Sequence, residues 1–244
     1  MTLPVFISDG PLSVGELAVL DSEEGRHAVA VRRIQVGEKI ELVDGFGTRA
    51  TCEVVETSKR GLTARVDAVE IENPEQPNFT VVQALAKGDR SDLALEILTE
   101  VGVDQIIPWS ATHSIAKWDE SGKSLNKWNR VVREASKQSR RARFPIVSDL
   151  HNLEQVVEKI QASDLAIVLH ESATDTLSAT GVPGSGEVLL IVGPEGGISE
   201  TELATFAAAG AKILQMGETV MRTSTAGGVG LAVLISQTNR WSSN

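Results

Sequence analysis

The stretch with the clearest chemical potential is residues 193–197, which read Gly-Pro-Glu-Gly-Gly. An apolar run ends just before it, and residues 199–202 after it match a capping box that begins a helix. Glycines let a ligand approach the backbone closely, and three of them exceed what a tight turn needs. The carboxylate of Glu195 would repel a polyphosphate. We therefore expect a shaped rim for a ligand that carries positive charge or presents hydrogen-bond donors.

A second loop of this kind spans residues 215–226, between an apolar run and a helical pattern. Arg222 lies where that helix should begin, and the helix dipole disfavours a cation there. A charge in such an unfavourable position is more often functional than accidental. We interpret Arg222 as a functional residue.

His170 and Glu171 follow a third apolar run. They could form an acid–base pair, although a histidine at the end of a strand more often makes a structural hydrogen bond. Ligands of open α/β sheets bind outside the carboxyl ends of the strands. The loops that begin at residues 170, 193 and 215 could therefore wall one pocket.

Several other chemistries are excluded or disfavoured by the sequence. Neither Ser199 nor Ser224 lies in a G-x-S-x-G elbow, which argues against a hydrolase. No set of His, Asp and Glu has metal-ligand spacing, so we expect no metal site. The single cysteine, Cys52, excludes an intrachain disulfide and suits a reducing cytosol.

Charge is distributed unevenly along this acidic chain, whose formal net charge is −10. Residues 117–143 contain nine Lys or Arg and three acidic residues. Because screening limits the reach of distant charges to about 8–10 Å, such a patch can still bind phosphate. A solvated helix face is the equally favoured alternative. We see no signal peptide, and the longest apolar stretch, residues 226–235, is too short to span a bilayer, so we expect a cytoplasmic protein without membrane contact.

Two domains are predicted from the patterns of apolar residues. Residues 1–72 contain short alternating runs with glycine turns, which predict a small β barrel. A polar segment with two prolines follows at residues 72–78. Residues 73–244 alternate buried strands with helices, which predicts a parallel α/β sheet. The expected strands are 39–43, 49–55, 62–69, 79–85, 105–107, 165–169, 188–192 and 212–215, with helices ending at 101 and spanning 125–141 and 223–239.

The two glycine loops together resemble the C-terminal signature of the SPOUT methyltransferases, and within them the RsmE family of 16S rRNA (uracil-N3) methyltransferases. The resemblance rests on residues 193–202 and on Met216-Gly217 followed by residues 220–226. Residues 87–90, 100–103 and 134–140 resemble further family segments, and Arg26-His27 with residues 31–34 match the N-terminal domain. It therefore covers nearly the whole chain.

This resemblance implies a PUA-like N-terminal barrel, a C-terminal domain closed by a trefoil knot, and a homodimer that acts on 16S rRNA or the small ribosomal subunit. Three glycines in the last helix, Gly227, Gly228 and Gly230, would pack against the knot or a second subunit. The implied cofactor is S-adenosylmethionine. The residues expected at its pocket are Leu169, His170, Gly193, Glu195, Gly196, Ile213, Leu214, Met216, Gly217, Met221, Arg222, Thr223, Ser224 and Ala226.

Arg222 is the catalytic candidate, because a fixed cation would stabilise a uracil that loses its N3 proton. RNA affinity is expected from the basic segment with help from the N-terminal domain. The residues concerned are Arg26, Arg32, Arg33, Arg130, Arg133, Lys137, Arg140, Arg141 and Arg143. The family commonly has a carboxylate where this chain has Ser224, which speaks against a general base at that position.

Two alternatives stay open at this point. The chain could be a SPOUT methyltransferase for another rRNA position or for tRNA. It could also be a non-catalytic RNA-binding module whose pocket has degenerated, a reading that the Ser224 departure keeps alive.

Overall fold

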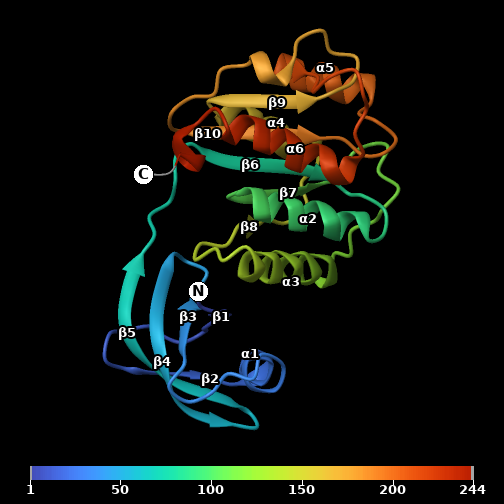
Figure 1. Cartoon of the computed structure of the whole chain (residues 1–244). Coiled ribbons are helices and arrows are strands. Elements are labelled where there is room, and N and C mark those ends of the chain that lie inside the picture. The colour runs from blue at the N-terminus through green and yellow to red at the C-terminus, as the bar shows by residue number, and fades with distance from the viewer. Residues whose placement is uncertain (1, 243–244) are drawn as a thin grey trace. The chain divides into compact units, whose positions relative to one another are not determined.

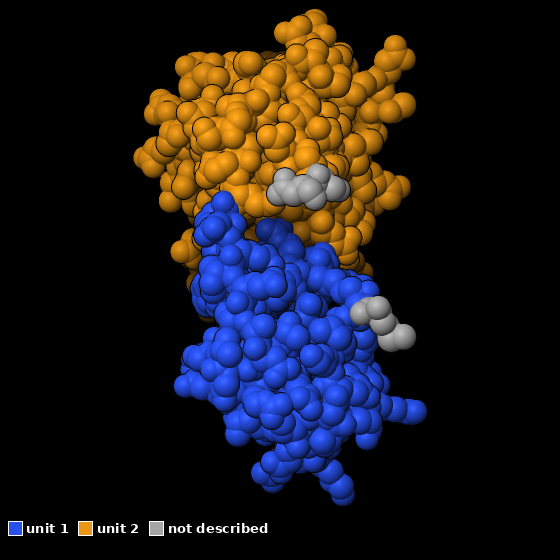
Figure 2. All heavy atoms as spheres, turned by 60° about the vertical axis from the view of Figure 1, so that its left-hand side comes forward, with its two compact units in different colours: residues 1–74, 136–144 blue, residues 75–135, 145–244 orange. Residues whose placement is uncertain are grey.

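The computed structural model describes residues 2–242, and Figure 1 shows the order of the helices and strands. The chain divides into two compact units, one of Met1–Pro74 with Ser136–Phe144 and one of Glu75–Ala135 with Pro145–Asn244 (Figure 2). The first cut lies within two residues of the predicted boundary. The segment Ser136–Phe144, in contrast, was placed with the second domain by the sequence and packs with the first unit.

The first unit is built on a five-stranded sheet with the order β1-β3-β4-β5-β2. Strand β1 runs parallel to β3, and the other neighbours are antiparallel. The sequence predicted a small barrel, and the described strands form a mixed sheet with β1 and β2 at its edges. The bounds are β1 (Val5–Ile7), β2 (Leu17–Leu20), α1 (Ser22–Arg26), the π-helical turn η1 (His27–Val31), β3 (Lys39–Val43), β4 (Thr48–Ser58) and β5 (Gly61–Ile71).

The core of this unit follows from the alternation that predicted its strands. Ile40 and Leu42 on β3 face the same side as Ala50, Cys52 and Val54 on β4, and all five are buried. The outward positions between them are polar or charged, as expected when one face of a sheet meets water.

The second unit is a six-stranded sheet with the order β11-β9-β10-β6-β7-β8, and every described pair is parallel. The strands are β6 (Asn78–Ala84), β7 (Gln105–Trp109), β8 (Ile146–Val147), β9 (Leu165–Leu169), β10 (Glu187–Val192) and β11 (Lys212–Leu214). Its helices are α2 (Arg90–Val101), α3 (Lys123–Gln138), α4 (Leu153–Ala162), α5 (Glu200–Ala208) and α6 (Thr223–Ile235), with short turns η2 (Leu177–Ala179) and η3 (Asn239–Trp241). The prediction of a parallel α/β sheet is confirmed, and the trefoil knot stays a prediction.

Helices cover both faces of this sheet and create two apolar layers. Side chains of α2, α3 and α6 share one buried cluster with β6, β7, β9 and β10. Side chains of α4 and α5 share a second cluster on the opposite face. Strands that are buried on both faces must be apolar throughout, which explains the continuous run of β10. No helix within residues 2–242 is long and apolar enough to cross a membrane.

Helix α6 lies unusually close to its neighbours because of its glycines. A Cβ on Gly228 would come within 2.2 Å of the Cγ2 atom of Ile97 on α2. A Cβ on Gly230 would come within 3.1 Å of Leu169 on β9, and one on Gly227 within 3.1 Å of the amide oxygen of Gln83 on β6. These glycines pack against helix α2 and the sheet of the same chain, and the packing against the knot or a second subunit that the resemblance implied stays a prediction.

Candidate active site

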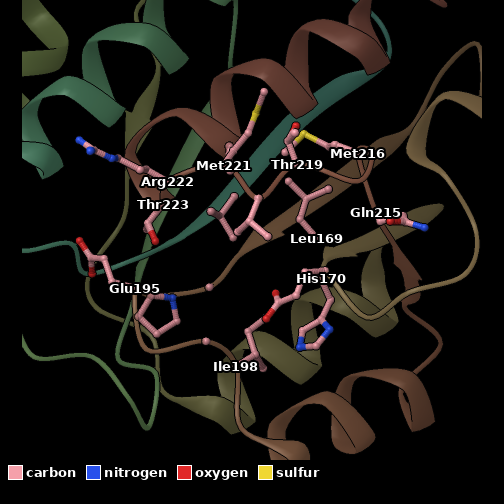
Figure 3. A pocket seen from close by; sticks show the side chains of 18 residues that line it. Leu169, His170, Glu195, Ile198, Gln215, Met216, Thr219, Met221, Arg222 and Thr223 are labelled. Carbon is pink, nitrogen blue, oxygen red and sulfur yellow. The ribbon is translucent and has the colours of Figure 1, made fainter.

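The main cavity of the second unit lies outside the carboxyl ends of three adjacent strands. Its volume is about 280 Å³. Strand β9 lies between β10 and β11, and the register places Leu169 beside both Val192 and Leu214. The loops that follow these strands therefore begin side by side and enclose one space (Figure 3). We call residues 193–198 the glycine rim and residues 216–221 the opposite rim.

Ten of the residues expected at a cofactor pocket line this cavity. They come from all three loops and from the start of α6, so the loops that we expected to share one pocket do so. The ten are Leu169, His170, Gly193, Glu195, Met216, Gly217, Met221, Arg222, Thr223 and Ala226.

The other four candidates do not line the cavity, and the physical reason differs between them. Ile213 and Leu214 belong to β11 itself, and their side chains pack into the two opposite core layers. Gly196 faces outward from the rim, where a Cβ would lie 2.9 Å from the Cβ of His113. Ser224 is in the first turn of α6 and is buried at 3% exposure. A carboxylate at that position would be deeply desolvated, whereas serine places no charge there.

The cavity is also lined by residues that were not on the expected list. For one of them, Ile198, the sequence contains a pattern that could have indicated its place. Ile198 precedes the N-cap Ser199 and shares a buried cluster with Leu203, four residues after the cap, which is the arrangement of a hydrophobic staple. The staple anchors the end of the glycine rim in the core. The remaining unlisted lining residues are Glu171, Val192, Pro194, Gly197, Gln215, Thr219 and Val220.

The capping box that begins α5 is confirmed, and it also holds a loop from another strand. Ser199 and Glu202 exchange the two hydrogen bonds of the box, at 3.2 Å and 2.9 Å. The other carboxylate oxygen of Glu202 accepts from the N–H and hydroxyl of Thr112, at 2.7 Å and 2.9 Å. Burial alone would raise the pKa of Glu202, but these hydrogen bonds outweigh it and leave the pKa below its ordinary value.

His113, which sequence reasoning missed, supports the glycine rim from the same loop after β7. Its Nδ1 atom lies 3.1 Å from the carbonyl oxygens of both Gly196 and Gly197. Two carbonyls can only accept, so Nδ1 must carry a proton and donate. These partners are more than eighty residues away in sequence, and no local pattern could have revealed them.

Glu195, at the tip of the glycine rim, is directed toward the loop that follows β6. One carboxylate oxygen accepts from the backbone N–H of Lys87 at 3.4 Å and lies 3.8 Å from Nη1 of Arg90. The glycine rim is therefore connected to the loops after both β6 and β7. In Figure 3, Glu195 and Arg222 lie at the end of the cavity away from Gln215.

Arg222 is the N-cap residue of α6, and its extended backbone turns the chain into the helix. Its carbonyl accepts from the N–H groups of Thr225 and Ala226, both at 2.9 Å, which anchors the residue. The side chain is exposed at the cavity, and within residues 2–242 its guanidinium has no carboxylate within 4.0 Å. A cation that is anchored by its backbone and free at its side chain can bind an anion that forms in the cavity.

His170 has a defined tautomer in this arrangement. Its Nδ1 atom is 3.2 Å from the backbone N–H of Ser172, so Nδ1 accepts and the ring proton of the neutral form is on Nε2. The sequence favoured a hydrogen bond of this kind over an acid–base role, and the role of His170 stays a prediction.

Several of the basic residues expected to bind RNA are engaged within the protein. The ammonium of Lys137 forms a 2.7 Å ion pair with Glu24, and both side chains are about 85% buried, with exposures of 16% and 15%. The guanidinium of Arg143 donates to the carbonyl of Glu72 at 2.9 Å. Exposed members of the set are Arg26, Arg32, Arg33, Arg130 and Arg140, while Arg133 and Arg141 are half-buried.

Comparison with known proteins agrees with this arrangement. Residues 73–235 match a family described as the RNA methyltransferase domain, and residues 20–67 match the RNA methyltransferase PUA domain. The chain is 42% identical over 247 residues to ribosomal RNA small subunit methyltransferase E of Mycobacterium tuberculosis, covering 99% of this chain and 94% of that protein. It is 29% identical to the protein of the same name from Bacillus subtilis, covering 90% of each.

Solved structures show the same fold over nearly the whole chain. The crystal structure of a ribosomal RNA small subunit methyltransferase E from Neisseria gonorrhoeae, bound to S-adenosyl methionine, superposes with a TM-score of 0.88 at 27% identity, covering 96% of this chain and 98% of that one. A methyltransferase of Legionella pneumophila in complex with the bound cofactor SAM also gives 0.88 at 27% identity, covering 98% and 99%.

A PUA domain joined to a parallel α/β domain, with a glycine-walled cavity at the carboxyl edge, defines the class of RNA methyltransferases. Within that class, the chain belongs to the ribosomal RNA small subunit methyltransferase E family.

Proposed function

We propose that the protein transfers a methyl group from S-adenosylmethionine to RNA of the small ribosomal subunit, and that the acceptor is N3 of a uridine in 16S rRNA. The observation that carries this proposal is the single cavity bounded by both rims, with an unpaired Arg222 at its edge. It lies in a chain that is 42% identical to a named small-subunit methyltransferase.

The lining residues fit S-adenosylmethionine, which when bound supplies an electrophilic methyl group on a sulfonium. Leu169, Met216 and Met221 offer an apolar surface for adenine, and the carboxylates of Glu171 and Glu195 suit the positive charges of the ligand. The close packing of Ile198 leaves no room for a side chain at Gly193, since a Cβ there would come within 2.6 Å of its Cγ1 atom. The residues proposed to hold the cofactor are the ten lining candidates named above.

The chain's main contribution to the reaction is positioning, because methyl transfer is an in-line displacement. The N3 atom of a paired uridine is blocked by its partner, so the base must be presented unpaired. The imide proton leaves N3 as the methyl group arrives, and the uracil becomes anionic on the way. Arg222 stabilises that charge on the carbonyl oxygens and cannot itself give up a proton. The proton goes to solvent or to Glu195.

Affinity for RNA is proposed to come from the exposed cations of both units, chiefly Arg26, Arg32, Arg33, Arg130 and Arg140. Contacts of this kind bind phosphate, so they give affinity that depends on salt and not on sequence. Replacing one of them with alanine should weaken binding and flatten the slope of log Kd against log salt by about one unit. Lys137 should contribute less to that slope, because its ammonium group is already paired with the carboxylate of Glu24.

The decisive experiment incubates the protein with labelled methyl donor and small ribosomal subunits from a strain that lacks it, followed by mass analysis of the nucleosides. We expect 3-methyluridine in 16S rRNA. At saturating S-adenosylmethionine, the Arg222→Ala variant should turn over about 100-fold more slowly or worse, whereas Arg222→Lys should retain part of the rate. Wild-type turnover in Arg222→Ala would refute the role given to Arg222.

The same assay separates the alternatives. A methylated nucleoside other than 3-methyluridine, or label in tRNA, would indicate a methyltransferase with another target. Binding of RNA without retention of S-adenosylmethionine would indicate a non-catalytic RNA-binding module.

A homodimer and a cytoplasmic location complete the proposal. Exposed apolar side chains on α2 and α6, Leu93 and Val229, together with Met221, support a contact with a second copy. Light scattering should give twice the 26.0 kDa of the chain. Fractionation of cells should place the protein with the small ribosomal subunits in the cytoplasm.

A further inference from the structure

Phe46, in the turn between β3 and β4 of the first unit, leaves an aromatic ring in water. It is 79% exposed, the highest value among the large apolar side chains that the structure describes. Isolated apolar residues on a surface are common and by themselves mean little. The question is whether the surroundings of Phe46 hold the ring outward for a purpose.

The turn that carries Phe46 is held by hydrogen bonds within the turn itself. The carboxylate of Asp44 accepts from the backbone N–H of Phe46 at 2.7 Å and from that of Thr48 at 3.0 Å. Burial alone would raise the pKa of Asp44, but the hydrogen bonds from Thr48 and Phe46 bring the pKa below its ordinary value. Asp44 thus stays ionised and keeps the turn closed at neutral pH.

Residues 142–144 form further hydrogen bonds with the same turn. The N–H of Gly47 donates to the carbonyl of Ala142 at 2.9 Å, and the N–H of Phe144 donates to the carbonyl of Gly45 at 2.8 Å. Both glycines have positive φ, at 83° and 108°, where a side chain would be strained. The backbone on each side of Phe46 is therefore immobilised, and the ring remains exposed although burying it would be favourable.

Two arginines beside the turn carry positive charge that no carboxylate neutralises. The guanidinium of Arg143 lies against Gly47, since a Cβ there would come within 2.4 Å of its Nη2 atom. Its observed partner is the carbonyl of Glu72, and its Nε atom is buried without a partner. Arg140 is exposed, and its backbone is held by a 2.8 Å hydrogen bond from Arg49. Among residues 2–242, neither guanidinium has a carboxylate within 4.0 Å, whereas Arg49 is paired with Glu41 and Glu72.

We propose that Phe46 stacks on an unpaired base of a single-stranded RNA segment, while Arg140 and Arg143 bind the phosphates that flank that base. Proteins that bind single-stranded RNA combine aromatic rings, on which bases stack, with cations that follow the backbone. A rigid turn suits this role because the ring loses little freedom on binding. The identity of the RNA as small-subunit rRNA rests on the proposed function; the stacking site itself rests on the geometry of the turn.

The test compares Phe46→Ala, Phe46→Leu and Phe46→Trp in the full-length protein, with Val36→Ala as a matched control. Val36 is also an exposed apolar residue of the first unit, at 59%. The first readout is the Kd for an unstructured RNA oligonucleotide of mixed sequence, measured by fluorescence anisotropy. Stacking is worth roughly 1–3 kcal/mol per base, so we expect Phe46→Ala to raise Kd about 5- to 160-fold.

The two other variants separate stacking from a merely apolar contact. Phe46→Leu should be as weak as Phe46→Ala because it lacks a ring, Phe46→Trp should bind at least as tightly as wild type, and Val36→Ala should be unchanged. Unchanged RNA affinity in Phe46→Ala, or full affinity in Phe46→Leu, would overturn the proposal. Arg140→Ala should also lower the salt slope by about one unit.

A second readout keeps this inference distinct from the proposed function. For methylation of small subunits, Phe46→Ala should raise KM for the subunit while kcat and the affinity for S-adenosylmethionine stay unchanged. If the wild type methylates no subunit but Phe46→Ala still loses oligonucleotide affinity, the proposed function fails and the stacking site stands. If methylation proceeds normally and all Phe46 variants match wild type in both assays, only the stacking site fails.

Discussion

The two rims of the cavity are built in opposite ways. The glycine rim is tied to its surroundings by His113, by the connection of Glu195 to Lys87 and Arg90, and by the staple at Ile198. For residues 216–221 of the opposite rim, no hydrogen bond is described in the structure, and Val220 is 76% exposed. One wall is therefore preorganised and the other adaptable, as expected where a ligand must enter before it is enclosed.

The largest expected effect comes from filling the preorganised wall. In Gly193→Val, even the Cβ atom would lie only 2.6 Å from Ile198, and the two methyl groups have no room there. The substitution would therefore push side-chain volume into the cavity. We expect the affinity for S-adenosylmethionine to fall at least 100-fold in calorimetry. Gly184→Val is the control, because a Cβ at Gly184 meets nothing within 4 Å. Tight binding by Gly193→Val would show that the cofactor does not use this rim.

Removing the carboxylate of Glu202, which joins the start of α5 to the loop after β7, should affect stability more than affinity. In Glu202→Gln, an amide N–H₂ group must face N–H and O–H donors, which we expect to cost about 1–3 kcal/mol of unfolding free energy. The pKa of Glu202 is lowered in the folded state. Its stabilisation is therefore complete above the unfolded value of about 4.3 and is lost as the pH falls through the lower folded value.

Denaturant unfolding across pH measures this contribution. The difference in unfolding free energy between wild type and Glu202→Gln should be largest near pH 7 and shrink below about pH 4. A difference that does not change with pH would mean that the ionised carboxylate is not what holds the two loops.

A smaller effect is expected from the hydrogen bonds of His113. The amide of asparagine can present an N–H close to where Nδ1 lies, whereas that of glutamine reaches toward the Nε2 position. His113→Asn should therefore keep the affinity for S-adenosylmethionine, and His113→Gln should lose about 2- to 10-fold, in line with a net 0.5–1.5 kcal/mol per hydrogen bond. Equal losses in both variants would contradict a specific role for Nδ1.

The smallest effect should come from the adaptable wall. Val220→Ser should change the unfolding free energy by less than about 0.5 kcal/mol, because the side chain is already in water. Amide hydrogen exchange gives the direct comparison: residues 216–221 should exchange fast in the free protein and slow down with S-adenosylmethionine, while residues 198–202 should be protected in both states. Strong protection of residues 216–221 from exchange without ligand would show that this wall is as preorganised as the glycine rim.

Much of the framework followed from local patterns. Strands β3 and β9 were predicted with their observed bounds, because alternation and a continuous apolar run are properties of the segment itself. Helix α4 escaped prediction although Asn152 and Gln155 form a capping box at its start. Strands β1 and β8 have three and two residues, too few to show a period.

The candidate site shows where sequence reasoning stops. Glycines and charges that follow apolar runs indicated the loops, because parallel strands bring their carboxyl ends together. The side chain of Leu214 points into the core instead of beyond the strand, so a role for this residue at the cofactor stays a prediction. The contacts of His113 with the glycine rim and of Lys137 with Glu24 join residues more than eighty positions apart, and only the fold brings them together.

The close packing of α6 against α2 at Gly228 connects the interior of the second unit with the position of Arg222 at the cavity. Any side chain at residue 228 would force the two helices apart, since no room exists beside Ile97. Because α6 starts directly after Arg222, a shift of this helix would carry the guanidinium away from the base that we propose it stabilises. A substitution deep in the protein, with no contact to cofactor or RNA, would then slow methyl transfer as a catalytic mutation does.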